Sequence, residues 1–293
     1  MQIADKKNIS VVIVNYNSGN LLAESLKNVL GKNSGREIEV VVVDNASNDS
    51  SLSHAEKSFP QVNFIKNNKN IGFSKAVNQG IKVIRGDFIL LLNPDTIIDI
   101  DVLWKMAAFL DNQKNSGIVG PKLLNLDGTV QLSCRSFPSF INALFNRYSP
   151  FTRIFPKNKY SAKYLYTDWN HDRPREVDWV SGACMLIKND MLRQIGPLDE
   201  DYFMYCEDID LCYRAKKANW NVYYCPDASA KHLIRSGKKR ATLKSIADHH
   251  VSMYKFFKKH YNKNSFLKNL TTSLFLVTSF FFMITYKKLM RAN

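Results

Sequence analysis

Three pairs of Asn and Asp residues are the side chains of this sequence best placed to do chemistry. Each pair follows an apolar run near the start of the chain: Asn15 and Asn17, Asp44 and Asn45, and Asn93 and Asp95. One Asn or Asp after a strand usually serves only the turn. Three pairs in succession favour a binding site, because parallel strands end at a common edge of the sheet, where open α/β sheets bind their ligands.

The stretch Asn93-Pro94-Asp95 indicates what kind of ligand such a site would hold, although alone it is equally compatible with a strand-ending turn. The sequence has no G-x-G-x-x-G after its first apolar run and no G-x-x-x-x-G-K-[ST], which excludes the usual dinucleotide and P-loop phosphate cradles. A nucleotide diphosphate bound here would need a divalent cation, Mg²⁺ or Mn²⁺, and Asp95 offers a hard oxygen ligand for it.

A second acidic cluster lies much later in the chain. Glu207, Asp208 and Asp210 occupy the first turn of a predicted helix, directly after an aromatic run at residues 202–205. Helix dipoles favour acids at this position, which accounts for any one of the three. Their grouping after the aromatic run favours a catalytic carboxylate as the alternative. Small residues around Gly182 predict a close approach of the backbone to a bound ligand.

The elements that must position these residues are visible in the apolar pattern. Strands are predicted at residues 9–14, 38–43, 62–65 and 88–92, with helices at 20–30, from 49 onward and at 72–83 between them. This β-α-β-α-β-α-β order is typical of a parallel sheet covered by helices. The predicted fold class is therefore α/β, with a mostly parallel central sheet and helices on both faces.

The second half of the chain has a less regular pattern. We predict helices at residues 101–110 and 207–219, strands at 117–120, around 179–184 and at 222–225, a turn at 125–128, and a turn at Pro226-Asp227 that ends the last strand. Residues 133–175 are rich in aromatic and basic side chains without a clear period. Such a stretch is either a substrate-binding flap or an irregular cover for the core.

Length and cysteine content limit the class of protein. A chain of 293 residues can bury a full core and forms one large domain or two modest ones. Its five cysteines include no C-x-x-C pair, which argues against a disulfide framework or a thiolate zinc site and suits a reducing cytosol. The charged N-terminus leads directly into a strand pattern, so we expect no signal peptide.

The net charge of +15 is concentrated at the C-terminal end. Residues 231–293 hold 14 Lys and Arg against one acid, a net charge of +13, which leaves +2 for the residues before them. A near-neutral body with a basic tail predicts that one end meets an anionic surface. A nucleic-acid-binding protein is the alternative from another class, but the sequence contains no nucleic-acid motif.

Two helices are predicted in the tail. Residues 244–261 have an apolar face beside Lys255, Lys258 and Lys259, and this helix either packs on the domain, which we favour, or lies on an anionic membrane. Residues 270–286 carry no charge. They would span about 25 Å, against a hydrocarbon core of about 30 Å. The segment therefore predicts a membrane-embedded or interfacial helix.

Six segments of this sequence together resemble family 2 glycosyltransferases of GT-A fold, the nucleotide-diphospho-sugar transferase fold. They are VVIVNYN at residues 11–17, VDNAS at 43–47, NIGFSKAVNQG at 70–80, LNPDT at 92–96, WVSGA at 179–183 and EDID at 207–210. The match covers about residues 9–232. Within the family, the chain is most similar to the rhamnosyltransferase-like branch that builds bacterial surface polysaccharides.

The resemblance implies a role for each matching residue. The nucleotide sugar would be bound by Asn15, Asn17, Asp44, Asn45, Asn78, Asn93, Asp95 and Gly182, with the first four at the base and ribose and Asn78 facing the nucleotide from the third helix. Asp95 matches the last acid of the family's D-x-D metal motif, whereas Asn93 replaces the first.

The remaining implied roles concern the metal and the proton. His232 falls where related enzymes can place a further metal ligand, and it is equally compatible with a structural role. Asp208 matches the general base, with Glu207 beside it as a second catalytic candidate. A non-catalytic scaffold is disfavoured because Asp44, Asp95 and Asp208 are all intact.

The implied activity is inverting, metal-dependent transfer of rhamnose from dTDP-rhamnose to a lipid-linked or polysaccharide acceptor in bacterial cell-surface glycan synthesis. The alternative is the same fold with UDP-galactofuranose or a UDP-N-acetylhexosamine as donor. Residues 1–240 would form the glycosyltransferase domain, with a nucleotide-binding half at 1–120 and an acceptor-binding half at 121–240, and residues 241–293 the basic tail. We expect the protein in the cytoplasm, held at the inner face of the cell membrane by this tail.

Overall fold

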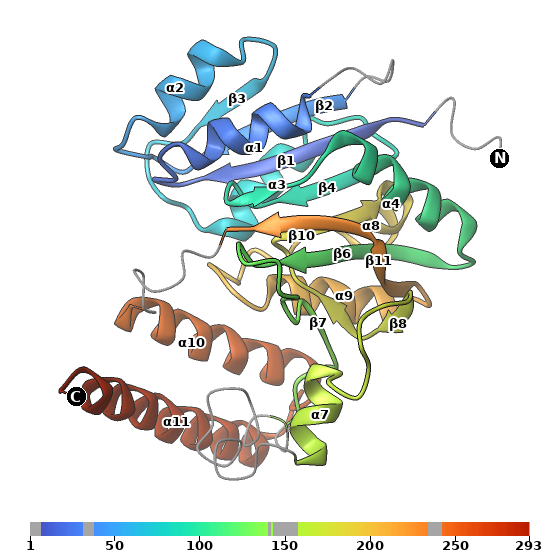
Figure 1. The fold of residues 1–293 in the computed structure, drawn as a ribbon. Helices are drawn as coiled ribbons and strands as arrows, with labels where there is room; N and C mark the ends of the chain where they lie inside the picture. Colours follow the sequence, from blue (N-terminus) through green and yellow to red (C-terminus); the bar gives the residue numbers. More distant parts are fainter. Residues whose placement is uncertain (1–6, 32–37, 140–141, 143–157, 234–241, 293) are drawn as a thin grey trace.

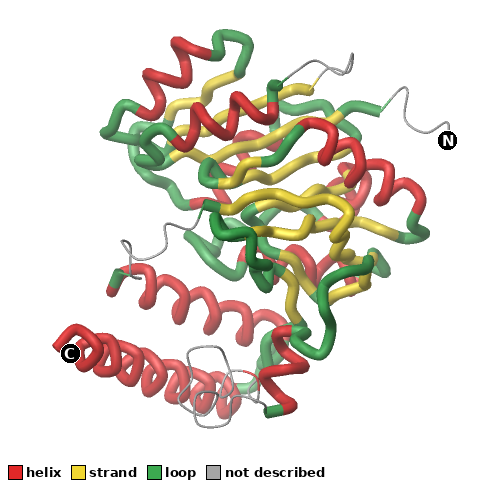
Figure 2. The backbone as a smooth tube through the Cα atoms, in the orientation of Figure 1, coloured by secondary structure: helices red, strands yellow, loops and turns green. Residues whose placement is uncertain are grey.

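A nine-stranded sheet runs through the middle of the computed structural model (Figures 1 and 2), which describes residues 7–31, 38–139, 142, 158–233 and 242–292. In order across the sheet, the strands are β3 (Asn63–Lys66), β2 (Ile38–Asp44), β1 (Ile9–Asn15), β4 (Phe88–Leu92), β10 (Cys184–Lys188), β6 (Ser116–Leu124), β11 (Asn221–His232) and β5 (Thr96–Ile97), with β8 (Arg175–Val177) also paired to β11.

The first four strands confirm the predicted parallel unit. β1 lies parallel to β2 and β4, and β2 lies parallel to β3. The connecting helices are α1 (Leu21–Val29), α2 (Ser51–Ser58) and α3 (Phe73–Ile81). β1 and β4 are buried along their whole length, and strands covered on both faces are typically near-continuous apolar runs, which only Ser10 and Asn15 interrupt in β1. The carboxyl ends of β1, β2 and β4 therefore meet at one edge of the sheet, as predicted.

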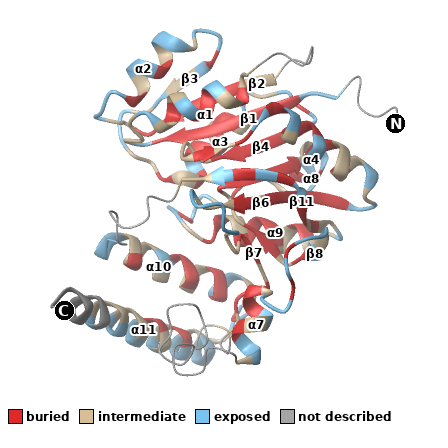
Figure 3. Ribbon diagram, viewed as in Figure 1, coloured by how far each residue is buried: buried red, intermediate tan, exposed pale blue. Residues whose placement is uncertain are grey.

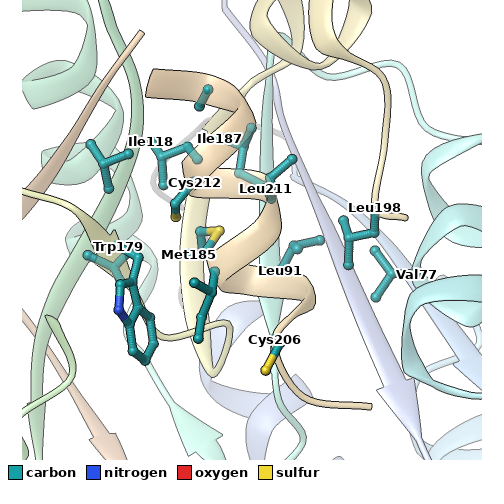
Figure 4. Close-up of a cluster of buried hydrophobic side chains, with 14 of the residues drawn as sticks. Val77, Leu91, Ile118, Trp179, Met185, Ile187, Leu198, Cys206, Leu211 and Cys212 are labelled. Carbon is teal, nitrogen blue, oxygen red and sulfur yellow. The ribbon is translucent and has the colours of Figure 1, made fainter. Parts of the chain in front are cut away.

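Each face of the sheet carries its own core, because successive side chains of a strand point to opposite faces. Val12 and Leu91 face one core, whereas Ile13 and Leu90 face the other. The first core is completed by α3, α8 (Asn189–Ile195), α9 (Glu207–Lys217) and α10 (Leu243–His260), and the second by α1, α2 and α4 (Ile100–Asn112). Figure 3 shows the buried strands between these helices, and Figure 4 shows the first core around α9. The prediction of helices on both faces is confirmed.

The second half of the chain adds strands of both directions. β10 lies antiparallel between β4 and β6, and β6 lies parallel to β11. The strand predicted around residues 179–184 is divided in two, because residues 181–183 turn away between β9 (Trp179–Val180) and β10. β9 pairs instead with β7 (Cys134–Arg135) in a separate two-stranded sheet.

β11 continues beyond the point where the sequence predicts its end. The predicted turn at Pro226-Asp227 was wrong: pairing with β6 stops after Cys225 and resumes at Ser229 with a shifted register. Proline has no N–H to donate, so the ladder is interrupted there, but the chain stays extended through an irregularity of the bulge type. The far end of β11 consequently reaches β5, where His232 lies opposite Thr96.

Two other predictions for this half are only partly met. The turn at residues 125–128 is present, with Asn125 N–H donating to Thr129 O at 2.8 Å, but its hairpin is reduced to one bridge between Leu124 and Val130. The aromatic segment 133–175 contains β7, β8 and the short helix α7 (Lys159–Leu165). Its residues 140–141 and 143–157 lie outside the described residues, as does the proposed domain boundary at residue 240.

The tail forms two helices that lie side by side (Figure 1). α10 packs Met253, Phe256 and Phe257 into the first core, as predicted. α11 (Phe266–Ala292) lies against α10, and Asn262 Nδ2 between them donates to Thr272 Oγ1 at 2.7 Å. Residues Phe266–Thr285 of α11 are long and apolar enough to cross a membrane, and little of this stretch is buried.

Candidate active site

The ends of β1 and β2 carry a closed polar cluster. Asn15 is fully buried and lies opposite Asp44 in the sheet register. Its Nδ2 bonds Asp44 Oδ1 at 2.7 Å, Ser47 Oγ at 3.1 Å and Ser51 Oγ at 2.9 Å, and Ser18 Oγ donates to its Oδ1. Because these bonds use the whole amide, Asn15 positions Asp44 and leaves the contact with a ligand to its neighbours.

Asp44 and Asn17 lie together at this edge. Asp44 Oδ2 accepts the Ser47 N–H at 2.9 Å, so both carboxylate oxygens are fixed in place. Asn17 has a left-handed backbone with φ of 52°, a conformation that Asn tolerates better than most residues. Its Oδ1 accepts the Asn48 N–H at 2.8 Å. The two strand ends are thus bound to each other through side-chain and main-chain groups.

Asn45 and Asn78 hold neighbouring segments. Asn45 Nδ2 donates to Gly72 O at 3.1 Å, which ties β2 to the start of α3. Asn78 donates to Leu198 O at 2.8 Å and to Glu200 Oε1 at 3.0 Å, and its Oδ1 accepts the Leu198 N–H at 3.1 Å. The whole amide of Asn78 therefore fastens α3 to residues 198–200, and its contact with the nucleotide stays a prediction.

Asp95 and His232 meet at the far end of β11. The Leu233 N–H donates to Asp95 O at 2.7 Å. His232 Nε2 lies 3.3 Å from Asp95 Oδ1, an oxygen that is buried and has no hydrogen-bond partner among the described residues. Gln131 Nε2 donates to His232 O at 2.9 Å, so Gln131 Oε1 faces His232 Nδ1 at 3.0 Å and accepts its proton. The other ring nitrogen, Nε2, faces Asp95.

This pair suits a divalent cation. A carboxylate oxygen and an imidazole nitrogen face each other, and a partner on the second nitrogen fixes the tautomer, as is usual for metal-binding histidines. Within the described ranges no group of three or more His, Cys, Asp or Glu could hold a metal ion. Asp95 and His232 would therefore share the cation with diphosphate oxygens and water, an arrangement that Mg²⁺ sites commonly use. No pattern in the sequence indicated that Gln131 would orient His232.

Asp208 lies in the first turn of α9, next to Gly182. Gly182 N–H donates to Asp208 Oδ2 at 3.0 Å, and Ile209 N–H donates to Oδ1 at 2.9 Å. Burial raises the pKa of Asp208, although these two N–H groups and the charge of Arg135 act to lower it. A half-buried carboxylate with a raised pKa is suited to accept a proton from a substrate hydroxyl.

Two hydrogen bonds from adjacent residues connect Asp208 to the segment that leads to the Asp95–His232 pair. Gly182 holds Asp208, and the carbonyl of the next residue, Ala183, accepts the Asn93 N–H at 2.9 Å. Asn93 lies two residues before Asp95. The short segment between β9 and β10 therefore brings the two acidic clusters, which are far apart in the sequence, to the same edge of the sheet.

Glu207 differs from its neighbour. It is buried, and its Oε2 has no hydrogen-bond partner among the described residues. Burial, together with the negative charge of Asp208, raises the pKa of Glu207 to about 8. With this pKa Glu207 stays protonated at neutral pH, and the two N–H groups that bind Asp208 favour the negative charge on Asp208. The structure thus favours Asp208 over Glu207 as the base.

Asp210, two residues after Asp208, is fully buried and has three nitrogen partners. Arg214 Nε, Lys259 Nζ and His260 Nε2 each lie 2.7 Å from its carboxylate. Burial alone would raise the pKa of Asp210, but the bonds from His260 and Lys259 and the charge of Arg214 hold it well below its usual value. The Arg214 contact is predictable from its i,i+4 spacing. The two tail residues are not, because no local pattern relates them to α9.

α10 also holds the segment that leads into α9. The contacts are Ser252 Oγ to Met204 O at 2.8 Å, Lys259 Nζ to Asp199 Oδ2 at 2.6 Å, and Lys255 Nζ to Asp201 O. Tyr205 and Cys206 have φ of 70° and 65°, left-handed values that cost about 1 kcal/mol or more for each such residue. The tail helix therefore stabilises a strained turn immediately before Glu207 and Asp208.

Comparison with known proteins identifies the family. Residues 10–196 match the family described as "Glycosyl transferase family 2". The chain is 30% identical, over 85% of its length and 83% of the relative's, to N-acetylglucosaminyl-diphospho-decaprenol L-rhamnosyltransferase of Mycobacterium tuberculosis. It is 28% identical, over 64% of its length and 68% of the relative's, to the rhamnosyltransferase WbbL of Escherichia coli.

Solved structures show the same fold at low sequence identity. GalNAc-T7 with UDP, GalNAc and Mn²⁺ is 15% identical, with a TM-score of 0.65 over 89% of this chain, which spans about half (49%) of that protein. The mannosyltransferase PcManGT of Pyrobaculum calidifontis with GDP-Man and Mn²⁺ is 16% identical, with a TM-score of 0.58 over 93% of this chain and 70% of its own. The fold is GT-A, and the chain belongs to glycosyl transferase family 2, where it is similar to rhamnosyltransferases.

Proposed function

We propose that the protein transfers a sugar from a nucleotide diphosphate donor to an acceptor hydroxyl with inversion, assisted by a divalent cation. The observation that carries this proposal is the placement of Asp208 and Asn93 by adjacent residues, Gly182 and Ala183. Through it, a carboxylate with a raised pKa shares one edge of the sheet with the Asp95–His232 pair. A base and a diphosphate site at one edge are what sugar transfer requires.

The donor would lie across the ends of β1, β2 and β4. Asp44, oriented by Asn15, would accept from the N–H of the base, with Asn17 and Asn45 beside it. Asp95 and His232 would hold the cation on the diphosphate. When bound, such a cation supplies Lewis-acid stabilisation of the leaving nucleotide diphosphate.

Asp208 would accept the proton of the attacking hydroxyl. The two N–H groups that bind its oxygens fix the carboxylate in one orientation, which lowers the entropy lost on reaching the transition state. One base on the face opposite the leaving group gives a single displacement, and therefore inversion at the anomeric carbon. Glu207 would keep its proton and take no part in this transfer.

dTDP-rhamnose is the proposed donor because two relatives are rhamnosyltransferases. The acceptor proposed from the name of the first is a sugar linked through diphosphate to a lipid. A UDP-N-acetylhexosamine donor is the second candidate, since the chain is 23% identical, over 80% of its length, to poly-beta-1,6-N-acetyl-D-glucosamine synthase of Staphylococcus aureus, of which it spans 52%.

A lipid acceptor would place the reaction at the cytoplasmic face of the membrane. α11 supports this location, because Leu267, Leu270, Leu274, Val277 and Phe281 are exposed and recur every three or four residues. This spacing gives one continuous apolar face. α11 is also fastened to α10, so we propose that it lies along the interface with the exposed face in the lipid.

The test is a panel of dTDP-rhamnose, UDP-galactofuranose and UDP-N-acetylglucosamine with a lipid-diphosphate sugar acceptor, with and without Mn²⁺. We expect product with dTDP-rhamnose, an inverted anomeric configuration by NMR, and loss of activity in EDTA. Transfer from another donor would correct the donor, retention would exclude the single displacement, and no product from any donor would refute the proposed function.

The cation role has its own prediction. Asp95→Ala should weaken donor binding in Mn²⁺ by about tenfold or more, and it should leave binding in EDTA unchanged, because only the cation-linked part of the affinity is removed. Isothermal titration with the donor measures both values. The exposed Asp101 of α4 provides the control, Asp101→Ala, which should bind as the wild type. Equal weakening with and without Mn²⁺ would exclude Asp95 as a metal ligand.

A further inference from the structure

The guanidinium of Arg135 packs against two aromatic rings close to the proposed base. Its Cζ lies 5.4 Å from the Trp179 ring centroid and 5.9 Å from that of Tyr164. Trp179 is itself fixed, since its Nε1 donates to Ser136 O at 2.9 Å. Both rings are buried, so the plane of the guanidinium is set by the surrounding protein.

The protein satisfies only part of the Arg135 guanidinium. The side chain of Arg135 shares a hydrogen bond with Tyr164, but its Nε is buried and has no hydrogen-bond partner among the described residues. Arg175 offers a comparison: it stacks on Tyr166 at 4.7 Å, but its Nη1 also lies 3.9 Å from Asp168 Oδ1. A buried guanidinium N–H without an acceptor costs about 1–3 kcal/mol, which a ligand anion would recover.

The strand pairing places Arg135 on the same side as Asp208. Arg135 lies opposite Trp179 in the β7–β9 pair, and Ser181 N–H donates to Ser133 O at 2.8 Å. The next residue, Gly182, binds Asp208. Arg135 and Asp208 are close enough that the charge of the arginine acts to lower the pKa of the carboxyl group. Asp95 and His232 lie outside this two-stranded sheet, at the β11–β5 edge of the large sheet.

We propose that Arg135 binds the phosphate groups of the acceptor, a sugar linked to lipid through diphosphate. This rests on the proposed function, in which Asp208 accepts a proton from the acceptor sugar. In that proposal the donor diphosphate binds at Asp95 and His232. The unpaired Nε–H of Arg135, beside Asp208, is therefore available to the second substrate. An arginine fork pairs with phosphate oxygens in two parallel bonds, and the stacked rings hold it ready for them.

The experiment compares two acceptors that differ only in charge: a synthetic N-acetylglucosaminyl diphosphate ester of a short alcohol and the N-acetylglucosaminide of the same alcohol. Arg135→Gln should raise KM for the diphosphate ester about 10- to 100-fold, as expected for loss of a charged hydrogen bond, while kcat changes little. KM for the glycoside and KM for the donor should not change. Arg135→Lys, which keeps the charge without the fork, should lie between.

Arg175→Gln is the matched control, because Arg175 stacks on aromatic rings in the same way but has a carboxylate neighbour. It should leave KM for both acceptors at the wild-type value. An equal rise in KM for the two acceptors, a rise in KM for the donor, or an equal effect of Arg175→Gln would overturn the proposal.

A binding measurement separates this proposal from the proposed function. The fluorescent diphosphate ester is titrated into wild type and Arg135→Gln without a donor, with circular dichroism to verify that both are folded. Binding lost only in the variant supports the phosphate site even if no donor gives product, and equal binding refutes it even if transfer occurs.

Discussion

Asp208 and Glu207 are neighbours in the chain, yet the structure gives their carboxyl groups different protonation. Asp208 accepts two backbone N–H groups, which stabilise its charged form. Glu207 has an oxygen without a partner and a pKa raised to about 8 by burial and by the charge of Asp208. Adjacent acids can therefore be tested for separate roles with one substitution each.

Replacing the two acids should have unequal effects on transfer. Asp208→Asn should lower kcat by about 10²- to 10⁴-fold, because the acceptor proton has no base, while donor binding stays at the wild-type value. Glu207→Gln should keep kcat within about threefold, because glutamine resembles the protonated acid in shape and charge. Steady-state kinetics and donor titration measure both. A larger loss in Glu207→Gln than in Asp208→Asn would exchange their roles.

Glu207 should also make stability depend on pH. The folded protein binds its proton with a pKa of about 8 and the unfolded chain with the ordinary 4.5, so the folded state holds more protons between these values. The stabilisation that this proton contributes should therefore be complete below pH 4.5, and the free energy of unfolding should fall as the pH rises towards 8. Glu207→Gln should remove this fall and be more stable than the wild type at pH 8, by at least about 1 kcal/mol.

Urea denaturation at pH 5, 6.5 and 8 measures this difference. Glu24→Gln is the control, since Glu24 is exposed on α1 and should give the wild-type profile. If the wild type and Glu207→Gln lost stability in parallel over this range, Glu207 would not hold a proton in the folded state.

At the scale of elements, α9 depends on α10, a helix that is separated from it in the chain by the strand β11. Asp210 is bound by Lys259 and His260 of α10, and the turn before Asp208 is held by the same helix. Removal of one partner from a buried charged cluster destabilises the fold. The tail therefore supports the helix that carries the proposed base, in addition to its proposed contact with lipid.

Lys259→Met should lower the free energy of unfolding by about 1–2 kcal/mol, less than for a fully buried pair because Lys259 is partly exposed and Arg214 and His260 remain. It should also lower kcat more than it raises KM for the donor, since the shift is confined to the first turn of α9. Lys258→Met, on the exposed side of the same helix, is the control and should match the wild type in both measurements. A loss of stability with unchanged kcat would show that α10 does not position Asp208.

Elements whose structure follows from their own residues were predictable from the sequence. β1 and β4 were recognisable as mainly apolar runs, and α9 as a helix with acids in its first turn. The extension of β11 past Pro226 was not visible, because it is set by pairing with β6 and β5. The same holds for the side of α3 that carries Asn78, which is decided by contacts with residues 198–200.

The candidate site shows the same division. Asp44, Asp95 and Asp208 were identifiable from their positions after strands or at a helix start. The residues around them were not, because Gln131 reaches His232, and Lys259 and His260 reach Asp210, from distant parts of the chain. Sequence reasoning therefore identified the charged groups, and the structure added the residues that orient and neutralise them.

At the scale of the whole molecule, one apolar face remains exposed. On α11, the side chains of Leu267 and Leu274 are 69% and 66% exposed, whereas Leu276 and Thr272 are buried. Figure 3 shows that much of α11 up to residue 285 is exposed. An exposed apolar face of this kind on a basic tail is expected to bind anionic lipid.

The triple variant Leu267→Ser, Leu270→Ser, Leu274→Ser should weaken binding to phosphatidylglycerol vesicles by about tenfold or more, since each buried leucine contributes roughly 1.5–3 kcal/mol. Co-sedimentation measures binding, and transfer to a water-soluble acceptor should be unchanged. Leu126→Ser, at an exposed leucine remote from the tail, is the control. Unchanged sedimentation of the triple variant would exclude α11 as the membrane contact.

The buried charge of Asp210 has a consequence for how the protein is made. Lys259 and His260 follow Asp210 by 49 and 50 residues, so they leave the ribosome well after α9 has been synthesised. Domains generally fold as they emerge, N-terminal parts first. A fully buried Asp210 that lacks these two partners would weaken the packing of α9 on the sheet. The packing of α9 is therefore completed only after α10 has emerged, ahead of α11, the helix that we propose to meet the membrane.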